Sequence, residues 1–543
     1  MKVLSPAISP YRRPWLRTDV LAGLATGAVV IPQAMAYATV AKMPVQIGLY
    51  TCMVPLVVYA FIGCSRTASV TTTSTIATLT ASTMIGAGIA AGSPDAQSHL
   101  ITLTLLVGVF LLIARLLRLG SVIENVSEAT LTGIKVGVGL TVAVAQLPKL
   151  LGVTENPSAT GFFGMLWSAV RQIGDANLVT VAVSIVSVTL LLLIGRFAPL
   201  VPGPLVVVVL GIGLAAFGGL PSMGVALIPE VPQGIPLPGL PALDHIGQLV
   251  PGALAIALMA FLETAAVARG VRRADEPPID ADRELSANGL AAVLGSFFHS
   301  LPPAGGFSQT GMNLRAGART QVSGLVTALL AVFVALFLAP VLSNLPQATL
   351  GAMVVVAVLG LVDIGALARL YRFDKVEFTL AVIVAVFGLT VGLLPAVAVG
   401  VLLTLYLVLR ELNQSHVVAL IDGRAADPDA AVVPADPLVL RFQIGLYAAN
   451  LRTNTAAVQR LATEQDPRPT AVVLDLSRLP RVSTTVLDGW RDMESALADA
   501  GIEVRYAAMR PGVHDMARRW PWWAEVEAQG RYFDTVAAAV ARE

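Results

Sequence analysis

Two polar segments interrupt the apolar part of this chain, and both could bind a small ion or solute. The first runs from Ser65 to Thr75, and six of the seven residues from Ser69 onward carry a hydroxyl group. The second, residues 301–310, reads Leu-Pro-Pro-Ala-Gly-Gly-Phe-Ser-Gln-Thr and opens a short apolar segment at a comparable place in the second half. Irregular backbone at membrane depth is tolerated only where it is buried or lines a polar cavity. A matched pair of breaks therefore predicts a transport site.

Other polar side chains lie inside predicted membrane helices. Gln33 and Tyr37 are four residues apart and share one helix face, where they could pack helices or contact a solute. Glu263 is the only acid expected deep in such a helix, where a charge costs at least ~2.5 kcal/mol. Because burial favours the neutral form, Glu263 could accept a proton. Sodium coordination with Thr264 and a structural hydrogen bond are the alternatives.

The composition indicates a membrane protein followed by a soluble domain. Of the 543 residues, 55% are hydrophobic and only 13% are charged, against roughly 25% charged in soluble proteins. Nearly all long apolar runs fall in residues 1–413, which predicts a transmembrane domain there and a separate domain over residues 414–543. The net charge of +1 and the lack of a basic cluster argue against nucleic acid as a partner.

Apolar segments long enough to cross or enter the bilayer divide into seven plus seven. Because each repeat has an odd number of helices, the second half must insert upside down relative to the first. This predicts an inverted-repeat, all-α polytopic protein with fourteen transmembrane helices. The expected segments are 20–40, 46–63, 71–88, 99–117, 124–148, 178–195, 202–218, 248–269, 285–299, 308–318, 322–339, 348–366, 376–393 and 395–412.

Loop charges predict the orientation of these helices. With a cytoplasmic N-terminus, eighteen Lys and Arg residues flank the inner ends and three flank the outer ends, while Lys135 lies within a span. This bias follows the positive-inside rule. We therefore expect an inner or plasma membrane location with a cytoplasmic tail. In that tail, residues 438–444, 471–476 and 501–508 favour strands, and 453–464 and 484–500 favour helices, which is typical of a small α/β domain.

Several ordered motifs resemble those of the SulP, or sulfate permease, family of anion transporters. The chain carries Pro32-Gln-Ala-Met-Ala-Tyr-Ala38 followed by Gly48-Leu-Tyr50. Phe261-Leu-Glu-Thr264, Gly306-Phe-Ser-Gln-Thr310 and Ala316-Gly-Ala-Arg-Thr-Gln321 follow in the family's order. The resemblance covers nearly the whole chain.

The resemblance implies a core domain of helices 1–4 and 8–11, a gate domain of helices 5–7 and 12–14, a cytoplasmic STAS domain and a homodimer. It also implies that an anion lies between the facing N-termini of half-helices 3 and 10. Helix N-termini suit this role because they present unpaired N–H groups and about half a positive charge. With Gln33 and Tyr37, the expected anion-binding residues are Val70, Thr71, Thr72, Thr73, Phe307, Ser308, Gln309 and Thr310.

The chain departs from the family pattern at several of these positions. Many relatives have Gly-Pro where this chain has Thr71-Thr72, and many have Ser-Arg where it has Ser308-Gln309. The missing arginine removes a fixed positive charge near the anion, which argues against importing a chloride or sulfate preference from such relatives. A substrate that forms more hydrogen bonds, or one accompanied by a cation, would suit the site instead. A related bicarbonate transporter subgroup has a hydroxyl where Val267 stands, which weakens the sodium alternative.

One segment of the tail could be regulatory. Residues 481–485 read Arg-Val-Ser-Thr-Thr, where STAS domains usually have Asp-Ser/Thr-Thr before a helix. Phosphorylation of Thr484 would add charge there. Because the usual Asp is replaced by Ser483, helix capping is the competing interpretation.

These observations favour a secondary active transporter of sulfate, bicarbonate or a dicarboxylate, driven by protons and working by elevator-type motion of core against gate. The expected partners are a small inorganic or carboxylate anion, a proton or sodium ion, a second copy of the chain and the lipid bilayer. The alternatives are a membrane regulatory scaffold centred on the STAS domain, a sodium-coupled bicarbonate symporter and a nucleobase transporter. The five histidines are scattered along the sequence, so we expect no enzyme, cofactor or metal site.

Overall fold

The computed structural model describes residues 7–8, 11–90, 92–93, 95–120, 128–156, 159, 161–198, 201–359, 362–421, 424–425 and 435–542. The start of the predicted span 124–148 and residues 360–361 of the predicted span 348–366 lie outside this part. The chain divides into two compact units, Met1–Leu403 and Thr404–Glu543, called here the helical unit and the tail unit.

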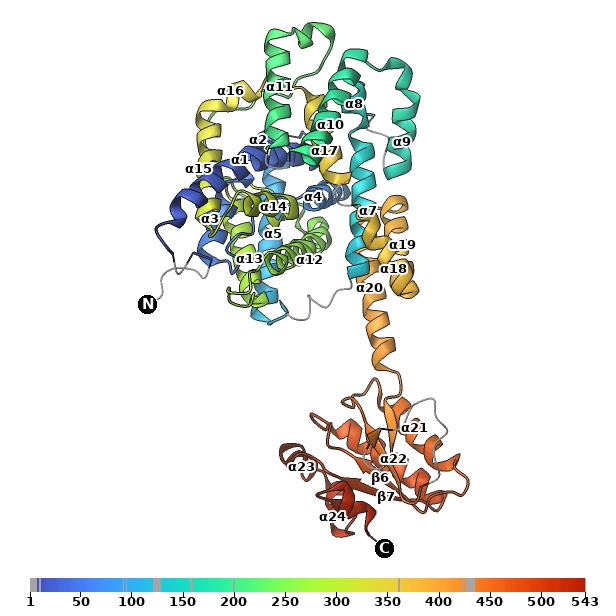
Figure 1. Ribbon diagram of the computed structural model, residues 1–543. Coiled ribbons are helices and arrows are strands. Elements are labelled where there is room, and N and C mark those ends of the chain that lie inside the picture. The colour runs from blue at the N-terminus through green and yellow to red at the C-terminus, as the bar shows by residue number, and fades with distance from the viewer. Residues whose placement is uncertain are drawn as a thin grey trace. The chain divides into compact units, whose positions relative to one another are not determined.

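The helical unit consists almost entirely of α-helices, and a helix overlaps each of the fourteen predicted segments. Within the described residues, nine helices or joined helices are long and apolar enough to cross a membrane. Fourteen spans in an inverted repeat therefore stay a prediction, whereas a multi-pass membrane protein is confirmed. The helices, many labelled in Figure 1, are α1 (Trp15–Val40), α2 (Val45–Thr51), α3 (Val54–Ile62), α4 (Ser74–Gly86), α5 (Ala96–Leu116), α7 (Glu128–Ala145), α8 (Leu147–Leu151), α9 (Gly161–Arg171), α10 (Leu178–Phe197), α11 (Gly203–Phe217), α12 (Ile246–Gly270), α13 (Ala281–Ser296), α14 (Phe307–Arg315), α15 (Val322–Phe333), α16 (Ala339–Leu342), α17 (Gln347–Leu359), α18 (Ile364–Phe373), α19 (Lys375–Thr390) and α20 (Leu393–Leu412).

Two groups of helices pack together inside the helical unit. In one group, α5 packs against α12 and α13, α4 packs against α12, and α1 packs against α2, α14 and α15. In the other, α7 packs against α9, α17 and α19, and α10 packs against α11 and α17. The groups meet where α1 contacts α11 and α17 and where α4 contacts α7. The helix starts described below lie near this meeting point.

A glycine allows one close helix crossing beside the polar face of α1. A Cβ atom built on Gly48 of α2 would lie 2.1 Å from the carbonyl oxygen of Ala34. Only hydrogen can occupy this position, since real Cβ atoms do not approach a backbone oxygen so closely. The crossing fixes the part of α1 that carries Gln33 and Tyr37.

The tail unit is an α/β domain, and the predicted strands and helices are present in it. Its six-stranded sheet has the order β4-β3-β5-β6-β7-β8. The β4–β3 and β3–β5 pairs are antiparallel, and the other neighbours are parallel. The strands are β3 (Val417–Ile421), β4 (Arg424–Ala425), β5 (Leu438–Phe442), β6 (Ala471–Asp475), β7 (Glu503–Ala507) and β8 (Tyr532–Phe533), and the helices are α21 (Leu451–Thr463), α22 (Thr484–Asp499), α23 (Pro511–Ala517), α24 (Pro521–Ala528) and α25 (Val536–Val540).

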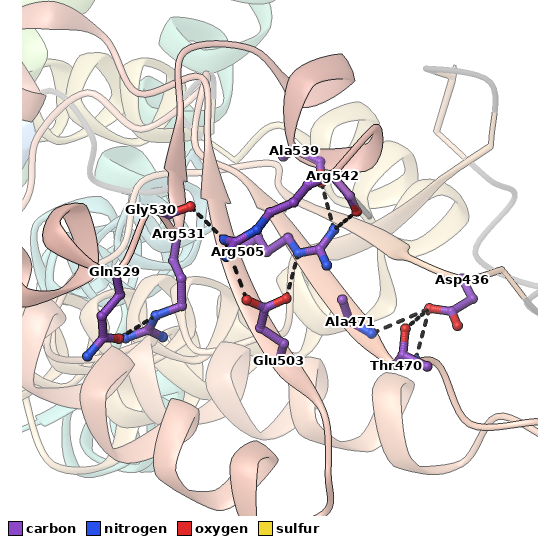
Figure 2. A network of polar contacts seen from close by, with 10 residues as sticks. All are labelled: Asp436, Thr470, Ala471, Glu503, Arg505, Gln529, Gly530, Arg531, Ala539 and Arg542. Carbon is purple, nitrogen blue, oxygen red and sulfur yellow. Dashed lines mark hydrogen bonds and ion pairs between the residues drawn. The ribbon is translucent and has the colours of Figure 1, made fainter.

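Aromatic packing and a polar network stabilise the tail unit. The buried ring of Trp490 stacks on Phe442 with centroids 6.3 Å apart. Figure 2 shows Arg505 of β7 between Glu503 and the C-terminal helix: its Nε donates to the Glu503 carboxylate at 2.8 Å, and its Nη1 donates to the carbonyl oxygen of Ala539 at 3.0 Å. A cluster of buried apolar residues that includes Phe442 and Trp490 lies entirely within this unit, so the tail has a core of its own.

Candidate functional site

Both polar segments form a short strand followed directly by a short helix. Residues Val70–Thr71 form β1, and Ala304–Gly305 form β2. The two strands pair antiparallel, with Val70 opposite Gly305 and Thr71 opposite Ala304. Helix α4 begins at Ser74 and α14 begins at Phe307. The strand pair thus holds the starts of two helices from different halves of the chain close together.

Side chains connect the two helix starts directly. The Thr71 hydroxyl donates to Oε1 of Gln309 at 2.7 Å, and Nε2 of Gln309 donates to the Thr72 carbonyl oxygen at 3.2 Å. On the other side of β1, the backbone N–H of Ser69 donates to Oγ1 of Thr310 at 2.9 Å. Gln309 and Thr310 together therefore connect the start of α14 to residues on both sides of Val70.

Exposure separates the predicted anion-binding residues into two sets. Val70, Thr71, Thr72, Gln309 and Thr310 are buried, with exposed fractions of at most 2%. Phe307 and Ser308 are exposed at the start of α14, and Thr73 is half-buried at the start of α4. Within the buried set, Thr71 and Gln309 bond to each other, and the Thr72 hydroxyl has no hydrogen-bond partner among the described residues.

Glu263 is tied to the start of α4. Its carboxylate is 6% exposed and accepts a 2.7 Å hydrogen bond from the Thr73 hydroxyl. The same hydroxyl oxygen caps α4 by accepting from the backbone N–H of Ile76 at 3.3 Å. The only predicted proton acceptor is therefore one hydroxyl away from a predicted anion-binding helix end.

Thr264 has a different role from its neighbour, because three hydrogen bonds occupy its hydroxyl. It donates to the Ala260 carbonyl oxygen at 2.6 Å and accepts from the Gly305 N–H at 2.9 Å and from Nδ2 of Asn288 at 3.2 Å. A hydroxyl has one proton and two lone pairs. No lone pair is left for a sodium ion, and Thr264 instead holds β2 against α12.

Gln33 and Tyr37 lie on the buried side of α1, which packs against α4 and α14. The Gln33 Nε2 donates to the Tyr37 hydroxyl at 2.8 Å. The Oε1 atom of Gln33 is buried and has no hydrogen-bond partner within the described part of the chain. Buried amide oxygens are normally paired, so this atom can accept a hydrogen bond from water or from a protonated solute.

Lys135 lies beside the start of α14, although sequence reasoning did not place it near the predicted site. It lies in α7, and its Nζ is 5.1 Å from the centroid of the Phe307 ring. A cation over an aromatic face is attracted by the ring. An ionisable residue inside a predicted span is the signal that could have found it.

Two further acids of the helical unit are buried, although both lie just outside the predicted spans 20–40 and 285–299 and not deep within a helix. Asp19 and Glu284 are both fully buried. The Glu284 carboxylate accepts from the Tyr59 hydroxyl at 2.9 Å and from the Cys64 N–H at 2.8 Å. Asp19 accepts from the Thr320 hydroxyl at 2.7 Å. Both acids lie near helix starts, where hydrogen-bond donors from neighbouring segments are available.

Two amide side chains brace the first break against the segment around α14. Nε2 of Gln321 donates to the carbonyl oxygens of Ser65 and Ala68 at 3.0 and 2.7 Å. Nδ2 of Asn313 donates to the Thr67 carbonyl oxygen at 2.9 Å. These bonds satisfy backbone groups that no helix or strand satisfies, and they fix the approach to β1.

Thr484 lies exposed at the first position of α22 in the tail unit. The cap of this helix is Ser483, whose hydroxyl accepts from the Val486 N–H at 3.4 Å. The capping interpretation therefore holds for Ser483, and Thr484 is left accessible.

Comparison with known proteins gives consistent relatives over nearly the whole chain. The sequence profile of the sulfate permease family matches residues 16–384. A probable sulfate transporter of Mycobacterium tuberculosis, MT1781, is 32% identical over 518 residues, which is 94% of this chain and 92% of the relative. Sulfate transporter 4.1, chloroplastic, of Arabidopsis thaliana is 27% identical over 550 residues, covering 93% and 80%.

Two solved structures share the fold. The murine anion transporter Slc26a9 in its inward-facing state superimposes with a TM-score of 0.88 at 22% identity, covering 99% of this chain and 93% of that one. The transmembrane domain of the cyanobacterium bicarbonate transporter BicA gives 0.63 at 22% identity, covering 71% and 98%. On the match over residues 16–384 and the identity to the mycobacterial relative, this chain belongs to the sulfate permease family.

Proposed function

We propose that this chain is a secondary active transporter that moves a small anion across a cell membrane together with a proton. The relatives are named as transporters of sulfate, and one fold neighbour as a transporter of bicarbonate. Sulfate is therefore the first substrate to test, with bicarbonate and dicarboxylates as competitors. Membership of this family leaves the nucleobase alternative without support.

The observation that carries the proposal is the junction between the starts of α4 and α14. The β1–β2 pair and the Thr71–Gln309 hydrogen bond hold the two starts together. Each start contributes unpaired N–H groups and about half a positive charge. In a site of low dielectric constant, two such ends attract an anion more strongly than they would in water.

The accessible donors at this junction define the anion site that we propose. They are the Ser308 hydroxyl and the first N–H groups of α14, since the Thr71 and Thr73 hydroxyls already donate to Gln309 and Glu263. Lys135 adds a full positive charge beside Phe307. It takes over the role that an arginine in place of Gln309 would have.

Glu263 supports proton coupling because of its position. An ionised carboxylate at the start of α4 repels an anion bound to the same helix end. Protonation removes this repulsion, so the anion and the proton favour each other's binding, which is a coupling free energy between the two sites. The occupied hydroxyl of Thr264 leaves the sodium alternative with fewer ligands.

Uptake into proteoliposomes tests this proposal. The wild-type protein should accumulate labelled sulfate when the outside is acidic, and unlabelled bicarbonate or dicarboxylates should be compared as inhibitors. Glu263→Gln mimics the protonated form, so this variant should bind and exchange sulfate but no longer accumulate it with a pH gradient. Glu377→Gln, an acid at the start of α19 away from the junction, is the matched control.

Three results would contradict the proposal. If Glu263→Gln accumulates sulfate with the pH gradient as the wild type does, then Glu263 does not carry the proton. If a sodium gradient and not a pH gradient drives uptake in the wild type, the coupling ion is sodium. If none of the offered anions enters the proteoliposomes, the proposed transport function itself is wrong.

Alternating access and assembly complete the proposal. The group containing α1, α4, α5 and α12–α15 would move as the core against the gate formed by α7, α10, α11, α17, α19 and α20, in an elevator-type motion. Lys135 belongs to the gate and Phe307 to the core, so their contact would form in only some states of the cycle. A homodimer in the inner or plasma membrane, with the N-terminus and tail in the cytoplasm, fits the charge bias of the loops.

The tail unit fits a STAS domain in its α/β architecture, and exposed Thr484 is its proposed regulatory position. A regulatory scaffold with little transport is the competing function. Deletion of residues 414–543 distinguishes the two, because a transporter should retain anion binding and residual flux. Loss of partner recruitment with no flux in either form would favour the scaffold.

A further inference from the structure

A second polar cluster lies outside the anion site, at the start of α5 and just before α12. It consists of His99, Asp244 and His245, and one donor atom from each lies within 4.8 Å of the other two. Nδ1 of His245 is 2.8 Å from Oδ2 of Asp244, and Nε2 of His99 is 3.8 Å from the same oxygen. The two imidazole rings meet edge to face at 4.8 Å.

The His99 ring is poorly explained by hydrogen bonding alone. It is 4% exposed, and its Nδ1 has no partner within the described part of the chain. Its Nε2 is too far from Asp244 for a hydrogen bond, because such bonds end near 3.2 Å. Nε2 is the nitrogen that faces Asp244, and because it makes no hydrogen bond to this carboxylate it is the donor that a shared metal ion would use.

We propose that His99, Asp244 and His245 bind a divalent transition-metal ion, with Zn²⁺ as the first choice. Two imidazole nitrogens and one carboxylate oxygen are typical ligands of Zn²⁺, and three protein ligands leave a fourth position for water. In a tetrahedral site with bonds of about 2.0 Å, the donor atoms lie about 3.3 Å apart. The distances of 2.8 and 3.8 Å from Asp244 bracket this value. Mg²⁺ and Ca²⁺ are disfavoured because they prefer oxygen ligands.

The backbone around the cluster is already held in place. The Thr102 hydroxyl of α5 donates to the Ala242 carbonyl oxygen at 2.5 Å, and the Ala242 N–H donates to the Ser98 carbonyl oxygen at 3.3 Å. These bonds join the first turn of α5 to the segment before α12. The metal ion would therefore bind to ligands on two fixed segments and lock the end of the α11–α12 connection against α5.

Metal binding to the purified full-length chain tests the inference without any transport measurement. The protein should be freed of its affinity tag and of bound metal, and then titrated with Zn²⁺ in a calorimeter. We expect one ion per chain and a rise in the melting temperature with Zn²⁺ concentration. Titration with Co²⁺ should give visible absorption bands of a nitrogen- and oxygen-ligated ion.

Variants assign the binding to the cluster. His99→Ala and Asp244→Asn should each weaken Zn²⁺ binding by about tenfold or more, since even outer-shell partners contribute that much. His416→Ala, a histidine of the tail unit outside the cluster, should bind as the wild type does. Asp244 is largely exposed, so its variant should fold even if His99→Ala does not. The inference would be overturned if the wild-type protein binds no Zn²⁺, or if Asp244→Asn binds Zn²⁺ and Co²⁺ with unchanged affinity and absorption bands.

Discussion

The hydroxyl of Thr73 donates a 2.7 Å hydrogen bond to Glu263 while its oxygen caps the first turn of α4. One side chain thus connects a buried carboxylate with the helix end proposed to bind the anion. A change in the protonation of Glu263 must alter this bond, because a neutral carboxyl group is a weaker acceptor and can itself donate. This contact is the physical link between proton and anion in the proposed mechanism.

Replacing Thr73 tests that link. Thr73→Val removes both hydrogen bonds, and loss of a helix cap costs about 1 kcal/mol. We expect a lower melting temperature in detergent and a shifted pH profile of sulfate uptake. Thr73→Ser keeps the hydroxyl and is the matched control. Equal pH profiles for the two variants would mean that the hydroxyl does not connect the sites.

Lys135 should contribute to anion affinity. Lys135→Met keeps a long apolar side chain but removes the charge beside Phe307. Hydrogen bonds to charged groups contribute about 1.5–3 kcal/mol, so sulfate should bind about tenfold more weakly or worse. Lys375→Met, at the exposed start of α19, removes a charge elsewhere and should have no effect. Sulfate titration of both purified variants decides this, and equal affinities would exclude Lys135 from the site.

The close crossing of α1 and α2 predicts a strong effect of one methyl group. In Gly48→Ala, the Cβ would lie 2.1 Å from the carbonyl oxygen of Ala34, so the helices must separate. We expect little folded protein in fluorescence-detected size-exclusion chromatography. In Gly213→Ala of α11, the added Cβ meets nothing within 4 Å, and the alanine favours the helix. If Gly48→Ala gives as much folded protein as Gly213→Ala, the crossing has room for a methyl group.

The tail unit should lose stability in acid through Glu527. Partial burial alone would raise the pKa of Glu527, but hydrogen bonds from Arg518 and His514 outweigh it and hold that pKa below its usual value. A lowered pKa in the folded state stabilises the fold above the unfolded-state pKa, near 4.3, and this contribution is lost as the pH falls through the folded-state value.

Unfolding of a fragment of residues 414–543, followed by tryptophan fluorescence, measures this effect. Glu527→Gln should unfold more readily than the wild type at pH 7, and the difference should shrink below about pH 4. The neighbouring acid Glu525 is exposed, so Glu525→Gln should follow the wild type at both pH values. A difference between wild type and Glu527→Gln that does not change with pH would contradict the assignment.

The features predictable from the sequence are those that depend on local composition. Hydroxyl-rich and proline-glycine segments cannot continue an apolar helix, so the two breaks and the starts of α4 and α14 follow from nearby residues. The tail strands and helices follow from periodicity in the same way. Ser483 as a cap is also a local property of the residues before α22.

The contacts across the fold could not be predicted in this way. The bond between Thr71 and Gln309, and the position of Lys135 over Phe307, depend on how helices from different halves pack. The same holds for His99 and His245, which look scattered in the sequence but lie together in the structure. Glu284 was overlooked because it lies at the start of its helix, where hydropathy indicates a loop.

The position of a bound anion tests the central claim most directly. Selenate has the charge and shape of sulfate, and its selenium atom gives an anomalous diffraction signal. The account predicts one strong anomalous peak between the starts of α4 and α14, within hydrogen-bond distance of Ser308. A peak at another place in the helical unit, with none at this junction, would contradict the account.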